Sequence, residues 1–307
     1  MNVLNVLNIL AHLAVCALFP PLLLGIIVKV KAFFGGRVGA PVLQPYWDLL
    51  RLFRKGSVFS RTTTWVFKAG PVIGLVSVGM ALVLMPLGGH PAPLAFTGDV
   101  VLFAYLLGLG RFFTIAAAMD TGSSFEGMGA AREAAFSALA EPGLFLGLMV
   151  LVRQAGASSL TLMLGTHAVQ QAWLGTGGAL VLVAVSFFVV LLVENSRVPV
   201  DDPTTHLELT MIHEVMVLDH SGPGLGAVLY GASLKLFLLG ALLVGVVYPF
   251  STGNTWADWG LFLAAMIALA IGVGIVESFM ARLRLLHVPR LLVAASVLSV
   301  FGIILAK

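Results

Sequence analysis

The sequence predicts an all-α polytopic membrane protein. We expect about eight transmembrane helices plus cytoplasmic amphipathic helices, in a single integral membrane domain over residues 1–307. Hydrophobic residues make up 59% of the chain and charged residues 10%, whereas about a quarter of the residues in a soluble domain are charged. The mean hydropathy is +1.04. The apolar residues form blocks of about 20, the length that crosses a bilayer as a helix, and not the short alternating segments of a membrane β-barrel.

Eight of these apolar blocks are predicted to be membrane spans. Their approximate ranges are 3–28, 69–87, 99–119, 134–152, 174–194, 226–250, 257–280 and 291–306. Pro20 and Pro21 predict a kink in the first span, because proline removes a helical hydrogen bond. This block lacks the basic region and the cleavage site of a signal peptide, so we expect it to remain as a span.

The positions of lysine and arginine predict the orientation. Thirteen of the seventeen lie in four loops that fall on one side of the alternating spans. These loops are 29–68, 120–133, 195–225 and 281–290. The opposite side has only Arg153 and Lys307. Because positive loops stay in the cytoplasm, we expect these four loops to be cytoplasmic. Both termini should then lie outside a cell inner (cytoplasmic) membrane.

Charge and cysteine content argue against several classes of function. The net charge of +3 is not arranged as a basic stripe interleaved with aromatic residues, so we expect no nucleic-acid partner. Cys16 is the only cysteine, which excludes a disulfide framework and a four-cysteine zinc or iron–sulfur site within this chain.

The histidines do not have the spacing of metal ligands. The segment HEVMV at 213–217 begins like a zinc-protease helix, but Val217 stands where the second histidine is required. His206, His213 and His220 are seven residues apart, which is roughly 10 Å of helix and too far for adjacent ligands of one ion. Phosphate-binding loops and serine-hydrolase motifs are also absent from the sequence. We therefore expect no metal or cofactor in this chain.

The segment LQPYWDLLRLFRK in the first cytoplasmic loop predicts an amphipathic helix. We expect it to start at Gln44, with Pro45 at its first helical position. Its predicted apolar face is Tyr46, Leu49, Leu50 and Phe53. Its polar residues, predicted to face elsewhere, are Asp48, Arg51, Arg54 and Lys55. Such a helix lies in the membrane interface. It could be a simple connector or a docking site, and both interpretations stay open.

The segment 193–220 gathers six of the chain's fourteen acids and three of its seven histidines. Within it, Asp202 is expected to cap a helix that begins at Pro203. The polar face of this helix is predicted to be His206, Thr210 and His213.

Several ionisable residues fall within or at the end of predicted spans. They are Arg111, Glu141, Glu194, Lys235 and Glu277. An ionisable side chain inside a membrane is costly unless it is paired or hydrated, and is a functional hypothesis by default. Together with the acids and histidines of 193–220, these groups could form a proton path from the cytoplasmic surface. They could instead be fixed charge pairs that set the register of the helices.

Three blocks of the sequence resemble a known family. They are GRVGAPVLQPYWDLLRLFRK at 36–55, AAAMDTGSSFEGMGAAREAAFSALAEPG at 116–143 and VENSRVPVDDPTTHLELTMIHEVMVLDHSGP at 193–223, followed by ESFMARLRLLHVPR at 277–290. The chain resembles the membrane subunit of energy-converting, group 4 [NiFe] hydrogenases and formate hydrogenlyases. That protein is similar to the membrane component of respiratory-chain complex I that lies beside the quinone chamber, which belongs to the subunit 1 family.

The resemblance implies a role in ion coupling. Glu141, Glu194, Asp201 and Glu208 match the acids of the family's coupling channel, and Arg197 matches its loop arginine. In the third block, Thr204 and His206 stand where complex I proteins have acids. The first block also has only GRVGAP where complex I proteins have a longer loop. These departures favour the hydrogenase branch over a quinone-binding role.

The resemblance also implies which partners and cofactors belong to the complex. The partners would be peripheral hydrogenase large and small subunits, an iron–sulfur subunit and antiporter-like membrane subunits. Iron–sulfur clusters and a nickel–iron site are expected in those partner subunits. The predicted proton path is Glu141, Glu194, Asp201, Asp202, Glu208, Glu214, Lys235, Glu277, Arg111, His206 and His213. The predicted contacts with the redox arm are Arg37, Gln44, Asp48, Arg197 and Asp219.

Three alternatives to this function remain. The chain could be the quinone-site subunit of a complex I-type oxidoreductase, or a non-catalytic structural anchor. It could also be a stand-alone secondary transporter, but such transporters usually contain inverted repeats or interrupted helices near the membrane midplane. The sequence contains neither feature.

Overall fold

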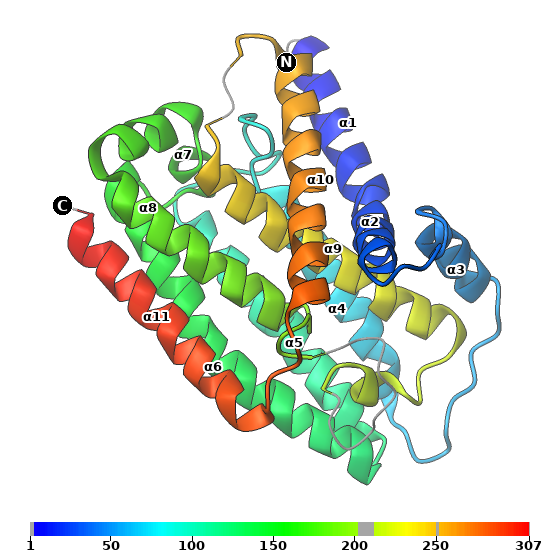
Figure 1. Cartoon of the computed structure of the whole chain (residues 1–307). Coiled ribbons are helices and arrows are strands. Elements are labelled where there is room, and N and C mark those ends of the chain that lie inside the picture. Colours follow the sequence, from blue (N-terminus) through cyan, green and yellow to red (C-terminus); the bar gives the residue numbers. More distant parts are fainter. Residues whose placement is uncertain (1–2, 202–211, 250–251, 307) are drawn as a thin grey trace.

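A computed structural model describes residues 3–201, 212–249 and 252–306 of the chain (Figure 1). In these ranges the chain forms helices and one isolated β-bridge, between Leu87 and His90, but no strand. The helices are α1 (Val3–Leu18), α2 (Pro20–Phe34), α3 (Gln44–Phe53), α4 (Trp65–Leu84), α5 (Asp99–Asp120), α6 (Ser124–Ala155), α7 (Leu160–Met163), α8 (Thr166–Glu194), α9 (Gly222–Val247), α10 (Thr255–Phe279) and α11 (Val288–Leu305), with 3₁₀ turns η1 (Glu214–Val217) and η2 (Leu285–His287). The predicted all-α class is confirmed.

The number of spans also agrees with the sequence. Among the described residues, seven helices are long and apolar enough to cross a membrane, or eight if the bent pair α1–α2 is one span. The two halves of that pair meet at 44°. The bend lies where the prolines predicted it, because the Pro20 ring interferes with the preceding turn while the two prolines suit the first turn of α2.

Two helices begin eight or more residues before the membrane spans that the sequence predicts. Helix α6 begins at Ser124 and α8 at Thr166, whereas the predicted spans begin at 134 and 174. The alanine-rich residues before 134 continue the α6 helix, because high helix propensity outweighs their lower hydropathy. In α8 the backbone is non-helical at Thr176, next to the expected start. The predicted cytoplasmic loop 120–133 is therefore helical from Ser124 onward.

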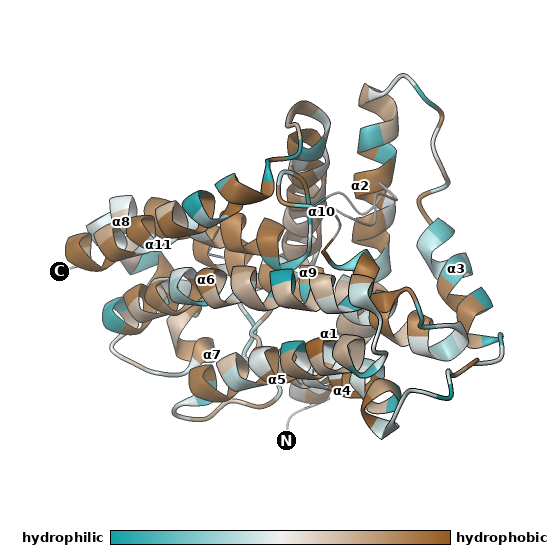
Figure 2. Ribbon diagram, turned by 90° about the horizontal axis from the view of Figure 1, so that it is seen from below, coloured by the Kyte–Doolittle hydropathy of each residue, from teal (hydrophilic) through white to brown (hydrophobic). Residues whose placement is uncertain are grey.

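Helix α9 is the central element of the bundle (Figure 1). It packs against α4 and α8, and also against α2, α3 and α10. Helices α6, α8 and α11 pack together on one side, and α4 packs along α5. Close approach depends on small residues, as expected in membranes: a Cβ on Gly70 of α4 would lie 2.6 Å from the Ala117 Cβ of α5. Hydrophobic colours dominate the long helices in Figure 2.

Helix α3 forms where the sequence predicts it, with a different orientation. Gln44 is its first helical residue, so Pro45 is second. Because α3 packs on α2 and α9, its half-buried side includes Asp48 and Leu49. Leu50 and Trp47 are 50% and 61% exposed. The prediction that Asp48 faces away from the covered side is wrong.

Candidate functional site

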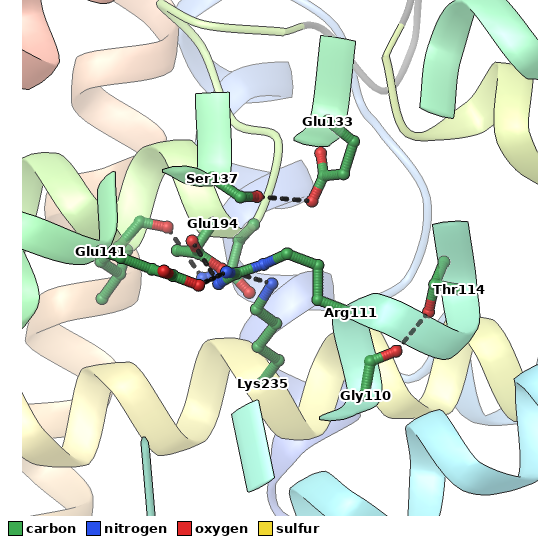
Figure 3. Close-up of polar contacts among 10 residues, drawn as sticks. Gly110, Arg111, Thr114, Glu133, Ser137, Glu141, Glu194 and Lys235 are labelled. Carbon is green, nitrogen blue, oxygen red and sulfur yellow. Dashed lines mark hydrogen bonds and ion pairs between the residues drawn. The ribbon is translucent and has the colours of Figure 1, made fainter. Parts of the chain in front are cut away.

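Charged side chains from four spans meet inside the bundle (Figure 3). Arg111 on α5 donates hydrogen bonds from Nη1 to Glu141 Oε1 on α6, and from Nη2 to Glu194 Oε1 on α8 at 2.8 Å. Lys235 on α9 places Nζ 2.7 Å from Glu194 Oε2. Each carboxylate oxygen of Glu194 thus has its own cation, and the side chain is only 5% exposed.

The position of Glu194 explains why it needs two cations. It is the last residue of α8, where the partial negative charge of the helix C-terminus disfavours an anion. Burial adds a further cost for an isolated charge. Arg111 and Lys235 compensate both effects, so we interpret the three residues as one electrostatic unit.

Glu133 also belongs to this cluster, although it is not among the residues predicted from the sequence. Its side chain is 9% exposed, and it accepts a hydrogen bond of 3.4 Å from Ser137 Oγ (Figure 3). Hydropathy predicted Glu133 at the end of the loop 120–133, outside the membrane. Glu133, Ser137 and Glu141 follow one another at intervals of four residues, and this spacing is the signal that puts all three on one face of a helix.

A small cavity of about 90 Å³ joins the charged groups. Its polar lining includes Arg111, Glu133, Glu194, His213 and Lys235. A polar cavity needs at least roughly 10–15 Å³ of this kind of volume to hold a water, and each water occupies about 30 Å³ in the liquid. There is room for several waters between the acids and Lys235, so protons could move between groups that do not touch.

A larger cavity of about 440 Å³, here called the chamber, lies beside the small one. Helices α2, α3, α9 and α10 and the segment after α8 surround it. Its charged or titratable lining is Lys31, Asp48, Arg197, Asp201, His213, Glu214 and Glu277. Asn195, Ser196 and His213 line both cavities. The chamber and the charge cluster are therefore neighbours, separated by only a few shared side chains.

Ion pairs hold the walls of the chamber. The buried Glu277 of α10 lies 3.0 Å from Lys31 Nζ of α2 and 3.4 Å from Arg197 Nη1. Asp201 lies 2.7 Å from Arg282 Nη2 and accepts the Ile212 N–H at 2.9 Å. These pairs join distant parts of the chain at one wall.

The predicted contacts with the redox arm separate into two groups. Arg37 and Asp219 are exposed. Arg197 is instead turned inward to Glu277, with a side chain 12% exposed, and Gln44 donates a 2.9 Å hydrogen bond to Asp48 in the chamber wall. The predicted path residues Asp202, His206 and Glu208, and the helix expected from Pro203, lie outside the described residues.

On the other side of the cluster, Glu141 reaches the outer surface of the bundle. Its side chain is 41% exposed and contributes to a groove of about 710 Å³ between α5 and α6. The rest of the groove is mainly apolar, with Tyr105, Phe112 and Phe145 among its lining residues. Ionisable groups thus extend from the chamber, through the cluster, to a membrane-facing groove.

His213 is the titratable group shared by the two cavities, in the segment between α8 and α9. Burial, together with the nearby positive charges of Lys235 and Arg197, lowers the pKa of His213 to about 4. Its Nε2 atom is buried and has no hydrogen-bond partner in the described part of the chain. His213 is therefore a neutral imidazole at neutral pH.

His220, near the end of the same segment, is also a buried histidine. It stacks on Phe67 of α4 at a ring separation of 4.0 Å. Burial lowers the pKa of His220 to about 4, opposed by the negative charge of Asp219. Both histidines are therefore neutral in the folded segment, whereas an unfolded histidine titrates near 6.5.

Lowering the pH from 7 to 5 is expected to loosen residues 212–221. Because the folded pKa values lie below the unfolded value, stability is present above about pH 6.5 and is lost as the pH falls toward 4, by about 1–2 kcal/mol per histidine at pH 5. The hydrogen-exchange protection factors of 212–221, which are corrected for the intrinsic pH dependence of amide exchange, should fall accordingly. His220→Phe keeps the stacking on Phe67 and should remove part of the pH dependence. Protection factors that are equal at pH 7 and pH 5 in the wild type would contradict this expectation.

The described residues contain no group of three or more histidine, cysteine or carboxylate side chains that could hold a metal ion. The chemistry that the arrangement supports is proton exchange. Glu133, Glu141 and Glu194 face two cations, Arg111 and Lys235. Because the carboxyl groups outnumber the cations, one of them can carry a proton without leaving a cation unpaired.

The fold and this site define a class: a polytopic helical membrane protein with ionisable groups connected through its interior. A family profile described as NADH dehydrogenase matches residues 7–307. The chain belongs to this family, among the membrane components of complex I and of related hydrogenases, as the sequence motifs predicted.

Several characterised proteins are similar to this chain. Formate hydrogenlyase subunit 4 of Escherichia coli is 34% identical, over 88% of this chain and 89% of that protein. Hydrogenase-4 component C of Escherichia coli is 31% identical, over 78% and 75% of the two chains. The H component of the NADH-quinone oxidoreductase of Syntrophotalea carbinolica is 25% identical, over 81% and 76%.

A solved structure shares the fold. A chain of the membrane-bound sulfane sulfur reductase, an archaeal respiratory membrane complex, superposes with a TM-score of 0.81 at 22% identity. The match covers 98% of this chain and 99% of that chain.

Proposed function

We propose that this chain is the membrane-anchoring, ion-coupling subunit of an energy-converting hydrogenase complex of the formate hydrogenlyase type. It would dock a peripheral redox arm and link electron transfer to the translocation of H⁺ or Na⁺. The similarity to formate hydrogenlyase subunit 4 and hydrogenase-4 component C supports the type of complex. The coupling role rests on one observation, the series of ionisable groups from the chamber to the α5–α6 groove.

In this proposal the chamber is the input end. A redox event in an arm docked beside it would change the charge near Glu277, Arg197 and His213. Charges interact strongly in a water-poor interior, so a proton shift at the chamber would alter the proton affinity of Glu133 and the balance of charge around Glu194. Lys235 and Arg111 would transmit the change to Glu141. No step requires a cofactor bound to this chain.

The partners follow from the two ends of the path. Large and small hydrogenase subunits and an iron–sulfur subunit would carry the nickel–iron site and the clusters, and would contact exposed loop residues such as Arg37 and Asp219. An antiporter-like membrane subunit would cover the α5–α6 groove, because a half-exposed carboxylate facing lipid is costly. It would receive the ion-coupled signal from Glu141.

Isolation of the complex tests the proposed assembly. A tag on this chain in its native host should co-purify hydrogenase large and small subunits in equal amounts, together with nickel and iron. This chain, separated from its partners, should contain neither metal nor flavin. Recovery of the chain alone, with ion transport in vesicles, would instead support the stand-alone transporter.

The chamber supports a second candidate, a quinone site. Leu24, Val28, Leu49 and Leu229 give it an apolar side, and a component of an NADH-quinone oxidoreductase is among the relatives. A photoreactive quinone analogue offered to the purified complex separates the two proposals. Labelling of α2 or α3 that is displaced by natural quinone, together with quinone-dependent electron transfer, would favour this candidate.

Cysteine labelling tests the proposed orientation in the inner membrane. Eight crossings, counting α1–α2 as one, put both termini on the same side. An introduced cysteine at the exposed Ser57 should react only from the cytoplasmic side, and one at the exposed Thr97 only from the outer side. The native Cys16 is 8% exposed and should give little background. The opposite labelling pattern would reverse the topology.

A further inference from the structure

The bend between α1 and α2, here called the break, leaves backbone carbonyl groups without their usual helical donors. The two helices meet at 44°, and α2 begins with Pro20 and Pro21. Proline has no N–H, so the donor that would serve the Ala17 carbonyl, four residues further on, is missing. Ala17 and Leu18 are both exposed. Because lipid offers no hydrogen bonds, such carbonyl groups need partners from within the protein.

Two tyrosine hydroxyl groups supply these partners. Tyr230 of α9 donates a hydrogen bond of 2.7 Å to the Ala17 carbonyl oxygen. Tyr46 of α3 donates to the Leu18 carbonyl oxygen. Each hydroxyl takes the place of a backbone N–H that an unbroken helix would provide. The end of α1 is therefore satisfied by side chains from two other helices.

The Tyr46 hydroxyl lies within the interrupted turn itself. In an unbroken helix the Leu22 N–H would donate to the Leu18 carbonyl oxygen. Here the Leu22 N–H donates to the Phe19 carbonyl oxygen at 3.1 Å, which makes a tighter turn. Burial raises the pKa of Tyr46, and the nearby Leu22 N–H opposes this rise. The hydroxyl is thus close to both groups of the missing hydrogen bond, and a side chain inserted in this way is a known cause of a sharp bend.

The two tyrosines connect the break to the walls of the chamber. Tyr46 is on α3 and Tyr230 on α9, and both helices line the chamber together with α2. The lining residues nearest to the tyrosines in sequence are Pro45, Leu49, Leu229 and Ala232. Helix α2 also lies directly against the backbone that leads into α3, because a Cβ on Gly25 would lie 1.9 Å from the Val42 carbonyl oxygen. Three helices of the chamber wall are therefore joined at the break.

We propose that the Tyr46 and Tyr230 hydroxyl groups fasten the break to α3 and α9, and thereby set the position of α2 in the chamber wall. The position matters most near the far end of α2, where Lys31 pairs with Glu277 at 3.0 Å. Lys31 is about 16 Å along the helix from Pro20, so a change of about 10° in the bend would move it by about 3 Å. A shift of this size is comparable with the length of the ion pair itself. The two tyrosines are positioning residues for the chamber.

The test uses the purified complex and substitutions that remove only a hydroxyl group. In Tyr46→Phe the Leu22 N–H can return to the Leu18 carbonyl oxygen. The bend should then decrease from 44° by about 10° or more, and the Lys31–Glu277 distance should grow by about 3 Å. Cryo-EM maps of the wild-type and variant complexes measure both quantities. A bend and an ion pair that match those of the wild type would overturn the proposal.

Tyr230→Phe tests the second hydroxyl by a different measurement, and it remains available if Tyr46→Phe does not assemble. Because Pro21 has no N–H, the Ala17 carbonyl cannot regain a helical donor. The hydrogen-exchange protection factors of residues 15–25 should therefore fall about fivefold. The control Tyr105→Phe removes the hydroxyl of a 74% exposed tyrosine on α5 and should change neither the bend nor the protection factors. Wild-type protection in Tyr230→Phe would overturn the role of Tyr230.

The ratio of ions moved to electrons transferred separates positioning from a purely structural role, and this measurement rests on the proposed function. A purely structural loss lowers the yield of the complex and leaves the ratio of the surviving complex unchanged. Displacement of α2 in Tyr46→Phe should lower the ratio. An unchanged ratio with a displaced α2 would overturn the chamber as the input end of coupling, and would still support the placement of α2 by the tyrosines. An undisplaced α2 would overturn this placement whatever the ratio.

Discussion

Replacing Glu141 with glutamine is expected to leave the complex assembled and to lower ion-coupled turnover by about tenfold or more, equal to about 1.4 kcal/mol on the limiting step. The side chain is 41% exposed, and its cation, Arg111, keeps Glu194 as a second partner. Assembly should therefore tolerate the change. Glutamine keeps the size and a hydrogen-bond acceptor, but it cannot take up or release a proton. The measurements are complex yield on a native gel and proton pumping in vesicles supplied with the native electron donor.

Phe145→Leu is the matched control for Glu141. Phe145 lines the same groove and is 46% exposed, but it does not titrate. The Phe145→Leu substitution should slightly reduce side-chain packing in the groove and leave ion-coupled turnover close to that of the wild type. Full pumping by Glu141→Gln would end the relay role of this residue. Loss of assembly in Glu141→Gln would favour the interpretation of the protein as a structural anchor.

Replacing Glu194 with glutamine is expected to prevent stable assembly. Glu194 is 5% exposed and pairs with Arg111 at 2.8 Å and Lys235 at 2.7 Å. Neutralising it leaves two buried cations with reduced compensation, and removing one partner of a buried pair costs about 3–5 kcal/mol. Complex yield and thermal stability in detergent measure the loss.

A second substitution tests whether the loss in Glu194→Gln comes from the unpaired charge of Lys235. Lys235→Met removes the ammonium group that Glu194→Gln leaves unpaired, while it keeps an unbranched apolar chain of similar length. The double variant should recover about 1–3 kcal/mol relative to Glu194→Gln alone. If Glu194→Gln alone is as stable as the wild type, Glu194 is not needed as a fixed charge. No recovery in the double variant would indicate that the unpaired charge of Lys235 is not the cause of the lost stability.

The two predictions assign different roles to two acids that look alike in the sequence. Both lie in or at the end of an apolar span, and both match channel acids of the family. They differ in surroundings: Glu194 has a cation on each oxygen, whereas Glu141 shares one cation and faces a groove. From the sequence, relay and fixed-pair interpretations are both open for all of these residues. The packing favours the fixed-pair interpretation for Glu194 and the relay interpretation for Glu141.

Much of the fold could be predicted because hydropathy is a local property. A block of about 20 apolar residues crosses a bilayer whatever its neighbours are, so the spans and the bend at Pro20 were predictable. The errors occurred where locally polar residues are buried by distant ones. Glu126, in the first turn of α6, is 1% exposed and accepts the Asp219 N–H at 3.0 Å. Hydropathy averaged along the sequence reflects the charge of Glu126, but it contains no information about the distant Asp219 N–H.

The candidate site was predictable in its residue types and not in its pairing. Local composition was sufficient to select Arg111, Lys235 and Glu277 as intramembrane charges. One of the two ion-pair partners of Glu277 is Lys31, which the sequence places in a loop because the first span was expected to end at 28. Such pairs depend on the rotation and relative depth of helices far apart in the chain. Those quantities come from packing around α9, where each side chain's neighbours are set by the whole bundle and not by the residues beside it in the sequence.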